Sequence, residues 1–311
     1  MTFPRLKAIA GLTVLVCLLV AYAPEAFAAA PPAGVKAKAV YAMNADTGEV
    51  YYEKNPDERY RMLSITKLLT ASVLMDLLQG DLSDRLTVEQ GDLAPGSSAE
   101  LKPGDVWSVE DLLYGMLLVS GNDASNAIAR YGGSIMLAME GQGGNGTQRF
   151  LQAMRNKARN LGATHTEIAD PHGMSRYNLS NARDLALLGA NAFRDPRLLP
   201  YWQCTRRTVQ IGGPNPRTKQ MKDIIEIVGE PGIVGAKTGS YFSKGLYNLI
   251  VGWRAPNGQT VVIVVLGAPS HPARYDDVRA IIDALPRDYP ALTRPAAISD
   301  PAPPPFTAEC R

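Results

Sequence analysis

Residues 246–268 read LYNLIVGWRAPNGQTVVIVVLGA, and this stretch decides the fold class. Two runs rich in Val, Ile and Leu flank Pro256-Asn257-Gly258, a tripeptide that favours a turn. Because β-branched residues favour a pleated, half-buried surface, the two runs predict a β-hairpin. A hairpin alone is only marginally stable in water, so its partner strands must come from elsewhere in the chain.

A second hairpin pattern lies near the other end of the chain. Residues 38–55, KAVYAMNADTGEVYYEKN, alternate apolar and polar side chains on both sides of Asp46-Thr47-Gly48. Since neither hairpin would be stable alone, we expect both to share one mostly antiparallel sheet. The sequence thus predicts a sheet built from its two ends.

Helical patterns fill the middle of the chain. Apolar residues between Ser64 and Gly80 surround most of a helix circumference, which predicts a central, buried helix. Asn181 or Ser180 is the expected N-cap of a later helix. The fold class is therefore α+β, an antiparallel β-sheet with flanking helices and a helical insertion, and a groove between sheet and helical lobe is the natural place for a site. The other expected helices cover residues 109–119, 125–130, 148–161, 181–192 and 274–285.

The first 28 residues differ from the rest of the chain. A basic stretch and an apolar run, together residues 5–23, precede small residues at Ala26 and Ala28. This pattern predicts a signal peptide over residues 1–28 that is cleaved after Ala28. An uncleaved membrane anchor is the alternative, and either segment would export the protein.

Composition suggests the remaining boundaries. Residues 29–36 are expected to form a linker, residues 37–286 a single catalytic domain, and residues 287–311 a disordered tail rich in Pro and Ala. Two cysteines remain after cleavage, Cys204 and Cys310. A disulfide is compatible with export, but because Cys310 ends a Pro-rich tail, we expect two free thiols.

Charge and motif content argue against several classes of function. The 32 Lys and Arg residues nearly balance the 30 Asp and Glu residues, and a net charge of +2 argues against a nucleic acid partner. The sequence contains no H-E-x-x-H string and no Cys and His spacing typical of zinc sites. We therefore expect neither a metal site nor a cofactor.

Three short motifs carry candidate chemistry, although each is weak alone. Ser64 and Lys67 are three residues apart, so they share a helix face, and a desolvated lysine can take the proton of a serine hydroxyl. The same pair also fits an N-capping serine and a lysine that reaches solvent. Residues 120–122, SGN, fit an ordinary helix-joining loop, and residues 237–239, KTG, fit the start of an ordinary strand.

Taken together the motifs are specific. The order S-x-x-K, S-x-N, K-T-G is the signature of penicillin-binding proteins and class A β-lactamases. The chain closely resembles the D-alanyl-D-alanine carboxypeptidase family, the low-molecular-mass penicillin-binding proteins or S11 serine peptidases, over roughly residues 36–270. This resemblance implies a β-lactamase/transpeptidase-like, three-layer domain. It rests on YAMNADTGEVYYEKNPDERYRMLSITKLLTA (41–71), SVEDLLYGMLLVSGNDASNAIA (108–129), ATHTEIADPHGMSRYNLSNARDLALLG (163–189) and GIVGAKTGSYFSKGLYNLIVGW (232–253).

The resemblance implies catalytic roles for three residues. Ser64 is similar to the acylated nucleophile of the family, and Lys67 to its general base. Ser120 would relay protons toward the leaving group. The implied reaction is acyl transfer through a Ser64 ester that water then hydrolyses, with peptidoglycan stem peptides ending in D-Ala-D-Ala as substrates and β-lactams as covalent inhibitors.

The family also implies substrate contacts. Asn122 would hold the substrate amide, Thr238 would bind the terminal carboxylate, and Lys237 would set the local charge. Gly239 would let a ligand approach the strand backbone. The oxyanion hole would combine the backbone N–H groups of Ser64 and Ser240, and each such donor lowers the barrier by about 3 kcal/mol.

The chain departs from the family pattern in two places. Family members often carry a further β-rich domain and an anchoring helix, whereas few residues follow the last strand here, so we expect membrane association only if the signal is uncleaved. Residues 217–225, RTKQMKDII, replace an Asn-rich stretch and could alter substrate preference. The loop at 170–173, DPHG, is expected to be structural, although it could line the site, and Lys244 is expected in solvent.

Three other functions share parts of this pattern. A D,D-endopeptidase acting on peptidoglycan cross-links would use the same Ser64 chemistry. A class A β-lactamase would require a glutamate, usually in E-x-x-L-N, and no such string occurs. A penicillin-binding scaffold without catalysis would normally show a broken motif, whereas all three are intact. The expected protein is a serine-type D-Ala-D-Ala carboxypeptidase at the periplasmic or extracellular face of a bacterial cell envelope.

Overall fold

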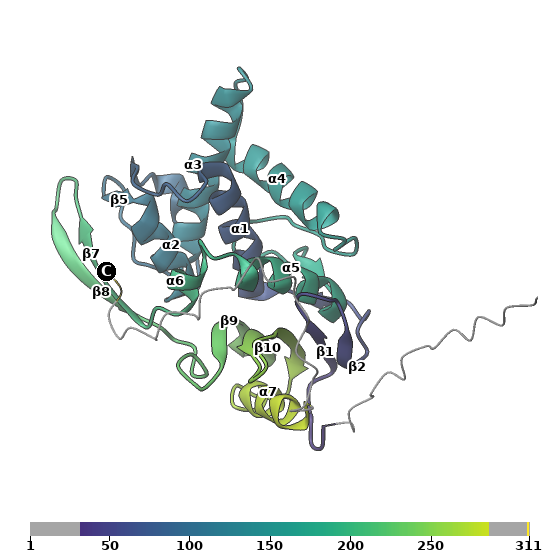
Figure 1. Cartoon of the computed structure of the whole chain (residues 1–311). Helices are drawn as coiled ribbons and strands as arrows, with labels where there is room; N and C mark the ends of the chain where they lie inside the picture. The colour runs from purple at the N-terminus through teal and green to yellow at the C-terminus, as the bar shows by residue number, and fades with distance from the viewer. Residues whose placement is uncertain (1–31, 286–309, 311) are drawn as a thin grey trace, which may run out of the picture.

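A five-stranded antiparallel sheet forms the centre of the fold (Figure 1). The structure, a computed structural model, describes residues 32–285 and residue 310. The predicted signal peptide, part of the linker and most of the tail lie outside these residues. The sheet order is β2-β1-β11-β10-β9, which leaves β2 and β9 at the edges. The strands are β1(Ala39–Asn44), β2(Val50–Lys54), β9(Ile233–Tyr241), β10(Leu246–Arg254) and β11(Thr260–Ala268).

The two ends of the described chain meet in this sheet, as predicted. Strand β1 pairs antiparallel with β11, with Ala39 opposite Leu266 and Asn44 opposite Val261. Both predicted hairpins are present, β1–β2 around Thr47 and β10–β11 around the turn at 256–258. The argument from hairpin stability is confirmed by this pairing.

The sheet is buried on both faces. Side chains alternate along β11, so Val262 and Val264 pack toward the helical lobe, whereas Val261, Ile263 and Val265 pack toward α7(Ala273–Ala284). Helix α7 covers one face, and α5(Ala182–Arg194) covers the other (Figure 1). Helix, sheet and helical lobe are therefore the expected three layers.

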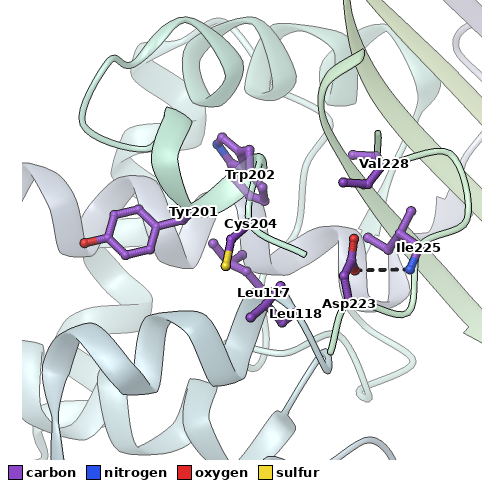
Figure 2. Close-up of a pocket in the computed structure, with 9 residues that line it drawn as sticks. Leu117, Leu118, Tyr201, Trp202, Cys204, Asp223, Ile225 and Val228 are labelled. Atoms are coloured by element: carbon purple, nitrogen blue, oxygen red, sulfur yellow. Dashed lines mark hydrogen bonds between the residues drawn. The ribbon is translucent and has the colours of Figure 1, made fainter. Parts of the chain in front are cut away.

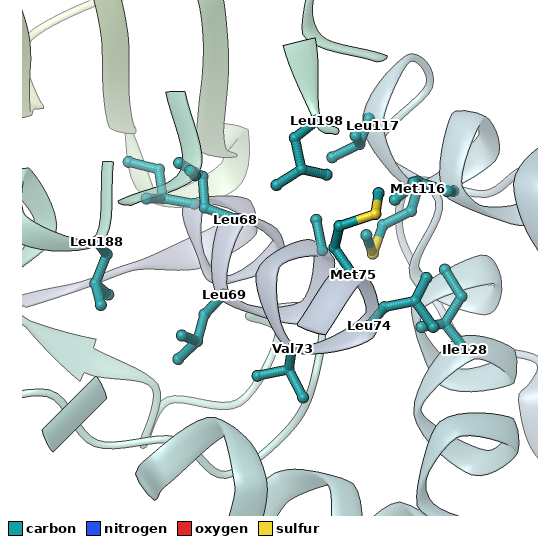
Figure 3. Close-up of a cluster of buried hydrophobic side chains, with 14 of the residues drawn as sticks. Leu68, Leu69, Val73, Leu74, Met75, Met116, Leu117, Ile128, Leu188 and Leu198 are labelled. Carbon is teal, nitrogen blue, oxygen red and sulfur yellow. The ribbon is translucent and has the colours of Figure 1, made fainter. Parts of the chain in front are cut away.

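Helix α1(Lys67–Leu78) is the centre of the helical lobe. Its side chains from Lys67 to Met75 are all buried, so no face of this segment meets solvent. Figure 3 shows Leu74 directed toward Ile128 and Leu69 directed toward Leu188, on opposite sides of the helix. Truncating such a buried leucine to alanine costs about 2–5 kcal/mol of stability. The expectation of a central helix is confirmed.

Other helices surround α1 at positions close to those predicted. Asn181 caps α5, since its side chain accepts from the Asp184 N–H, as predicted. The helix expected at 125–130 is longer and begins at Asn122. Helix α1 begins at Lys67 after the 3-10 turn η1(Leu63–Thr66), later than the predicted start at Ser64, and the alternative of an N-capping serine is not found. The rest of the lobe is α2(Val109–Leu117), α3(Asn122–Met139), α4(Gly146–Asn160) and α6(Leu199–Trp202).

Three two-stranded ladders complete the described fold. The hairpin β7(Arg206–Ile211)–β8(Arg217–Lys222) was not predicted, and it extends away from the body (Figure 1). In this hairpin only Val209, Ile211 and Met221 are buried. Its sequence therefore lacks the regular alternation of apolar and polar residues that predicts a strand. The other short elements are β3(Tyr60–Arg61) with β6(Leu179–Ser180), β4(Arg85–Thr87) with β5(Val106–Ser108), η2(Gln90–Asp92) and η3(Phe242–Lys244).

Cys204 and Cys310 form a disulfide, so the expectation of free thiols is wrong. The Cys310 N–H donates to Arg206 O at 3.0 Å, and this backbone contact brings the two cysteine Cα atoms to 5.7 Å. The Arg207 guanidinium reaches Cys310 O at 3.5 Å. The sequence could not show this because the partners are 106 residues apart and the strand that receives Cys310 was not predicted. At residue 310, the tail is attached to the body.

Within residues 32–285 and residue 310, no helix combines the length and hydropathy needed to cross a bilayer.

Candidate active site

Ser64 and Lys67 lie at the junction of η1 and α1, directly beneath edge strand β9. The Nζ atom of Lys67 lies 3.1 Å from Ser64 Oγ. Ser64 is half-buried, whereas Lys67 has no exposed surface. The hydroxyl is thus accessible to a reactant while the amine behind it is shielded from water.

Lys67 has three hydrogen-bond partners. Besides Ser64 Oγ, its Nζ lies 2.7 Å from Asn122 Oδ1 and 3.0 Å from His172 O. A neutral amine has two N–H groups and one lone pair. The two carbonyl acceptors use both N–H groups, so the lone pair of the neutral amine is directed at the Ser64 hydroxyl.

The environment of Lys67 favours the neutral amine. Burial holds the pKa of Lys67 well below its usual value, and the charge of Lys237 lowers this pKa further, while Asp170 and Asp123 oppose the shift. Desolvation is therefore the main cause of the lowered pKa of Lys67.

Lys237 and Ser120 form a second lysine–serine pair. Lys237 Nζ lies 2.9 Å from Ser120 Oγ, and both side chains are buried. Burial lowers the pKa of Lys237 to about 7, with Asp223 raising it and Arg274 lowering it. Ser120 has a φ of 58°, a left-handed conformation that costs energy for a residue with a Cβ. This strained turn directs the hydroxyl toward β9.

The loop before α3 is packed without spare room. A Cβ on Gly121 would lie 2.8 Å from Asp123 Oδ1 and 2.9 Å from Ala99 N, so only glycine fits there. Asn122 uses both ends of its amide, since Nδ2 donates to Pro95 O at 2.7 Å and Oδ1 accepts from Lys67. Asn122 is therefore held rigidly against Lys67.

Residues 237–239 lie inside β9, so the expectation that they begin a strand is wrong in position. Gly239 faces η1, and a Cβ there would lie 2.8 Å from Met62 O and 3.5 Å from Ser64 N. The expected reason for this glycine was approach by a ligand. The structure adds another, because Gly239 lets β9 pack directly on the turn that carries Ser64.

Thr238 and Ser240 flank Gly239 on β9. Thr238 is almost fully buried, and Ser240 is half-buried. Strand β9 pairs with β10 on one side only, with Ser240 opposite Tyr247, so its other edge lies toward η1. An extended peptide could add to such an edge by backbone hydrogen bonds.

Arg274 is a site residue that the sequence motifs missed. It is 2% exposed, and its Nη1 lies 2.6 Å from Ser240 Oγ. Its Nη2 donates to Tyr275 Oη, while its Nε has no partner among the residues that the structure describes. The available signal was that Arg274 lies four residues before Val278 and seven before Ile281, on the buried stripe of α7.

The segment that departs from the family pattern contributes Asp223. Asp223 and Cys204 both line a small pocket (Figure 2), where Asp223 Oδ1 accepts from the Ile225 N–H at 3.1 Å. Burial raises the pKa of Asp223 to about 7, and Lys237 lowers it. Among the charges acting on Lys237, Asp223 has the largest effect. The segment at 217–225, which departs from the family pattern, therefore contributes a carboxylate that raises the pKa of Lys237.

Two other candidates from the sequence were the loop at 170–173 and Lys244. The loop at 170–173 reaches the site through the backbone, since His172 O accepts from Lys67. Lys244 is exposed, as expected. Over residues 32–285 and residue 310, no group of three or more His, Cys, Asp or Glu side chains could hold a metal ion.

Comparisons with known proteins agree with this geometry. The family model Peptidase_S11, D-alanyl-D-alanine carboxypeptidase, matches residues 25–270. The D-alanyl-D-alanine carboxypeptidase DacC of Escherichia coli is 31% identical over 289 residues, which cover 88% of this chain and 67% of that protein. The chain spans about two thirds of that relative's length.

Two further relatives are informative. The D-alanyl-D-alanine endopeptidase of Pseudomonas aeruginosa is 34% identical over 173 residues, or 55% of this chain and 52% of that protein. The crystal structure of the Streptomyces K15 DD-transpeptidase superposes with a TM-score of 0.74 at 28% identity, covering 82% of this chain and 98% of that one. The likeness thus extends from the motifs to the whole fold.

Proposed function

This chain belongs to the D-alanyl-D-alanine carboxypeptidase family, the S11 serine peptidases, and we propose that it removes the terminal D-Ala from peptidoglycan stem peptides. The observation that carries the proposal is the contact between Lys67 Nζ and Ser64 Oγ at 3.1 Å, with the amine buried and the hydroxyl half-exposed. This is the arrangement that general-base activation of a serine nucleophile requires.

Acylation begins with proton transfer. Neutral Lys67 takes the proton of Ser64, and Ser64 Oγ attacks the carbonyl carbon between the last two D-Ala residues. The carbonyl electrons move onto oxygen, where the N–H groups of Ser64 and Ser240 would hold the oxyanion. The close packing of Gly239 on the Ser64 turn supports this pairing of donors.

Ser120 and Lys237 would serve the leaving group. When the carbon–nitrogen bond breaks, the amine of the departing D-Ala needs a proton. Ser120 can pass one from its hydroxyl and recover it from protonated Lys67 or from Lys237, which lies 2.9 Å away. Water then adds to the Ser64 ester, and the same groups return the serine to its starting state.

Positive charge would recognise the terminal carboxylate. Two cationic side chains lie at this part of β9: Lys237 belongs to the strand and directs its Nζ at Ser120, whereas Arg274 reaches Ser240 from α7. Thr238 follows Lys237 on the same strand and offers a hydroxyl. A substrate carboxylate here would meet two cations and a donor, which favours peptides with a free C-terminus.

The endopeptidase alternative rests on the Pseudomonas relative. It requires a peptide continuing beyond the scissile bond, whereas two cations beside Thr238 favour a free carboxylate. Cross-link cleavage is therefore kept as the alternative to the proposed carboxypeptidase activity. β-Lactams carry a carboxylate next to a strained amide, so they should acylate the same Ser64.

The disulfide fits an oxidising compartment, which supports export to the cell envelope. Relatives that act on D-alanyl-D-alanine point to the same place, since peptidoglycan lies outside the cytoplasmic membrane. We propose residues 1–28 as the signal and residues 37–286 as the catalytic domain.

The test is release of D-Ala from a pentapeptide ending in D-Ala-D-Ala, measured beside release from a cross-linked dimer. Wild type should release D-Ala from the pentapeptide faster, and a fluorescent penicillin should label Ser64. Ser64→Ala should lose both signals. Ser243→Ala, at an exposed serine three residues beyond Ser240, is the matched control and should behave as wild type. No release from either substrate by wild type would contradict the proposal.

A further inference from the structure

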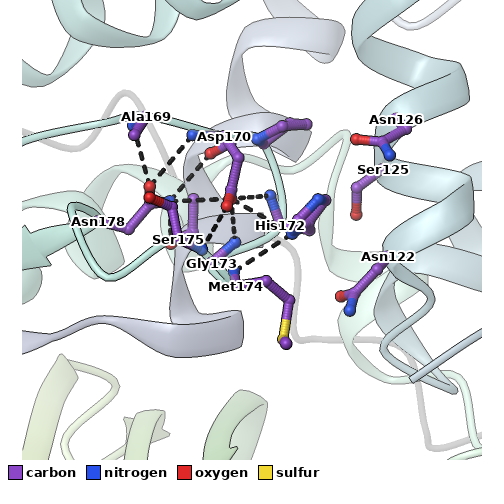
Figure 4. A network of polar contacts seen from close by, with 12 residues as sticks. Asn122, Ser125, Asn126, Ala169, Asp170, His172, Gly173, Met174, Ser175 and Asn178 are labelled. Carbon is purple, nitrogen blue, oxygen red and sulfur yellow. Dashed lines mark hydrogen bonds and ion pairs between the residues drawn. The ribbon is translucent and has the colours of Figure 1, made fainter. Parts of the chain in front are cut away.

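The loop at residues 169–178, between α4 and α5, is folded around one carboxylate (Figure 4). Asp170 Oδ1 accepts from the N–H groups of His172 at 3.0 Å and Gly173 at 2.5 Å. Asp170 Oδ2 accepts from the Ser175 N–H at 2.5 Å. Asn178 Nδ2 donates to Asp170 Oδ1 at 3.2 Å. The carboxylate thus determines the path of the backbone on both sides of His172.

This loop presents two successive carbonyl groups to α1. His172 O accepts from Lys67 Nζ at 3.0 Å, and Pro171 O accepts from Thr70 Oγ1 at 2.6 Å. Thr70 lies three residues after Lys67, so both contacts fall on one face of the helix. The loop therefore fixes its own position against α1 through Thr70, and it accepts a hydrogen bond from Lys67.

The same loop packs against the turn that carries the nucleophile. Gly173 has a φ of 94°, and a Cβ on it would lie 1.8 Å from Leu63 O. No side chain can be accommodated at that distance. The loop backbone thus contacts Leu63 on one side of Ser64 and Lys67 on the other.

We propose that Asp170 is a positioning residue that aligns Lys67 with Ser64 by holding the His172 carbonyl in place. It does not touch the reacting atoms, and it acts through the loop backbone. The inference rests on the proposed function, because alignment matters only if Lys67 activates Ser64. A displacement of about 1 Å at such a base can cost 10²-fold in rate.

Asp170 also belongs to the set of titratable groups that face Lys67. From the loop these are Asp170 and His172, from α3 Asp123, and from β9 Lys237. Burial lowers the pKa of His172 to about 4, with Asp170 raising it and Lys67 lowering it, so its ring is neutral at working pH. The Asp170 anion favours the Lys67 ammonium, so removing that charge lowers the pKa of Lys67.

The two roles of Asp170 give Asp170→Asn a distinctive effect. The plateau rate of acylation should fall roughly 10- to 100-fold, because the His172 carbonyl is held less firmly. The acid limb of the pH profile should move to lower pH by roughly half a unit to one unit, because Lys67 is deprotonated more easily. A residue that merely stabilised the fold would lower the amount of active protein without moving that limb.

The experiment measures the second-order rate of acylation by a fluorescent penicillin from pH 5 to 9. Asp170→Glu keeps the charge but displaces the carboxylate, so its rate should fall while the acid limb stays close to that of wild type. Glu167→Gln is the matched control, since this exposed carboxylate lies three residues earlier and pairs with Arg59 on the surface. Its acylation rate and the acid limb of its pH profile should both match those of wild type.

The outcomes separate the inference from the proposed function. Wild type and Glu167→Gln that fail to label would overturn the proposed function itself. Labelled wild type together with an unchanged plateau rate in Asp170→Asn would overturn only the role of Asp170. If Asp170→Asn does not fold, Asp170→Glu decides, and a wild-type rate for that variant would overturn the inference.

Discussion

Lys67 and Lys237 are both fully buried, and the charge of Lys237 lowers the pKa of Lys67. Each amine lies beside its own serine, Lys67 beside Ser64 and Lys237 beside Ser120. Two adjacent ammonium groups without solvent would be costly, so the pair favours one neutral lysine. Lys67, whose pKa is lowered by burial and by the charge of Lys237 and whose amine lies beside the Ser64 hydroxyl, is suited to be that neutral member.

Replacing Lys237 should move the acid limb of acylation upward. In Lys237→Gln the like charge is gone, so the Lys67 ammonium is less disfavoured and its pKa rises. The free base then appears only at higher pH, which is the direction opposite to Asp170→Asn. Fluorescent-penicillin labelling across pH measures this, and exposed Lys244→Gln serves as the control. A downward shift would contradict the assigned coupling.

Lys67→Arg should abolish acylation although it keeps a cation at the site. A guanidinium cannot lose its proton at any pH that the protein tolerates. Loss of a general base costs about 10²–10⁴ in rate. Stopped-flow or gel-based labelling at pH 8 would measure the decrease. Near-normal labelling of the folded variant would mean that another group takes the Ser64 proton.

Gly239→Ala should separate β9 from the nucleophile turn. The new Cβ would lie 2.8 Å from Met62 O and 2.9 Å from Leu63 Cβ, so strand or turn must shift. We expect a loss of roughly 1–3 kcal/mol in stability and slower acylation, by about 100-fold, through displacement of the oxyanion donors. Gly143→Ala, which meets nothing within 4 Å, is the matched control. Equal melting and labelling of the two variants would contradict the packing argument.

Reduction of the disulfide should lower stability and leave Ser64 chemistry intact at room temperature. The Cys204–Cys310 bond joins residues that are 106 positions apart. Closing such a loop lowers the conformational entropy of the unfolded chain, which stabilises the folded protein by about 2–5 kcal/mol. Denaturant midpoints with and without reductant measure the effect. Cys310→Ser should match the reduced protein and respond no further to reductant. A midpoint insensitive to reductant in the wild type would argue against the bond.

The penicillin ester of Ser64 should persist for minutes or longer. A carboxylate that activates water must keep a free lone pair directed at the ester. The nearby Asp170 carboxylate is already bonded to backbone N–H groups of His172, Gly173 and Ser175, so it is poorly suited to that task. Mass spectrometry of the acyl-enzyme over time would follow the ester, and rapid return of free enzyme would contradict this expectation.

Much of the fold and the candidate site could be predicted because their signals are local or repeat a known order. The hairpin patterns required partners, and this led correctly to the β1–β11 pairing. The motif residues Ser64, Lys67 and Ser120 could be named because their residue types and spacing are themselves the signal. The roles assigned to them remain predictions.

Other features depend on distances in space that the sequence does not show. Arg274 reaches Ser240 from a helix outside every motif. Cys310 reaches Cys204 only because it pairs with the backbone of an exposed strand that has few buried side chains. The part played by Asp170 depends on which carbonyl its loop turns toward Lys67, and residue identity does not reveal that orientation.

The pairing of β1 with β11 also has a consequence for the order of folding. Strand β1 is synthesised long before β11, the strand with which it pairs in the central sheet. Until β11 exists, β1 has only β2 beside it in the sheet. Closure of the sheet is therefore a late, long-range event, which is typically slow and leaves the early chain open to aggregation or to a chaperone.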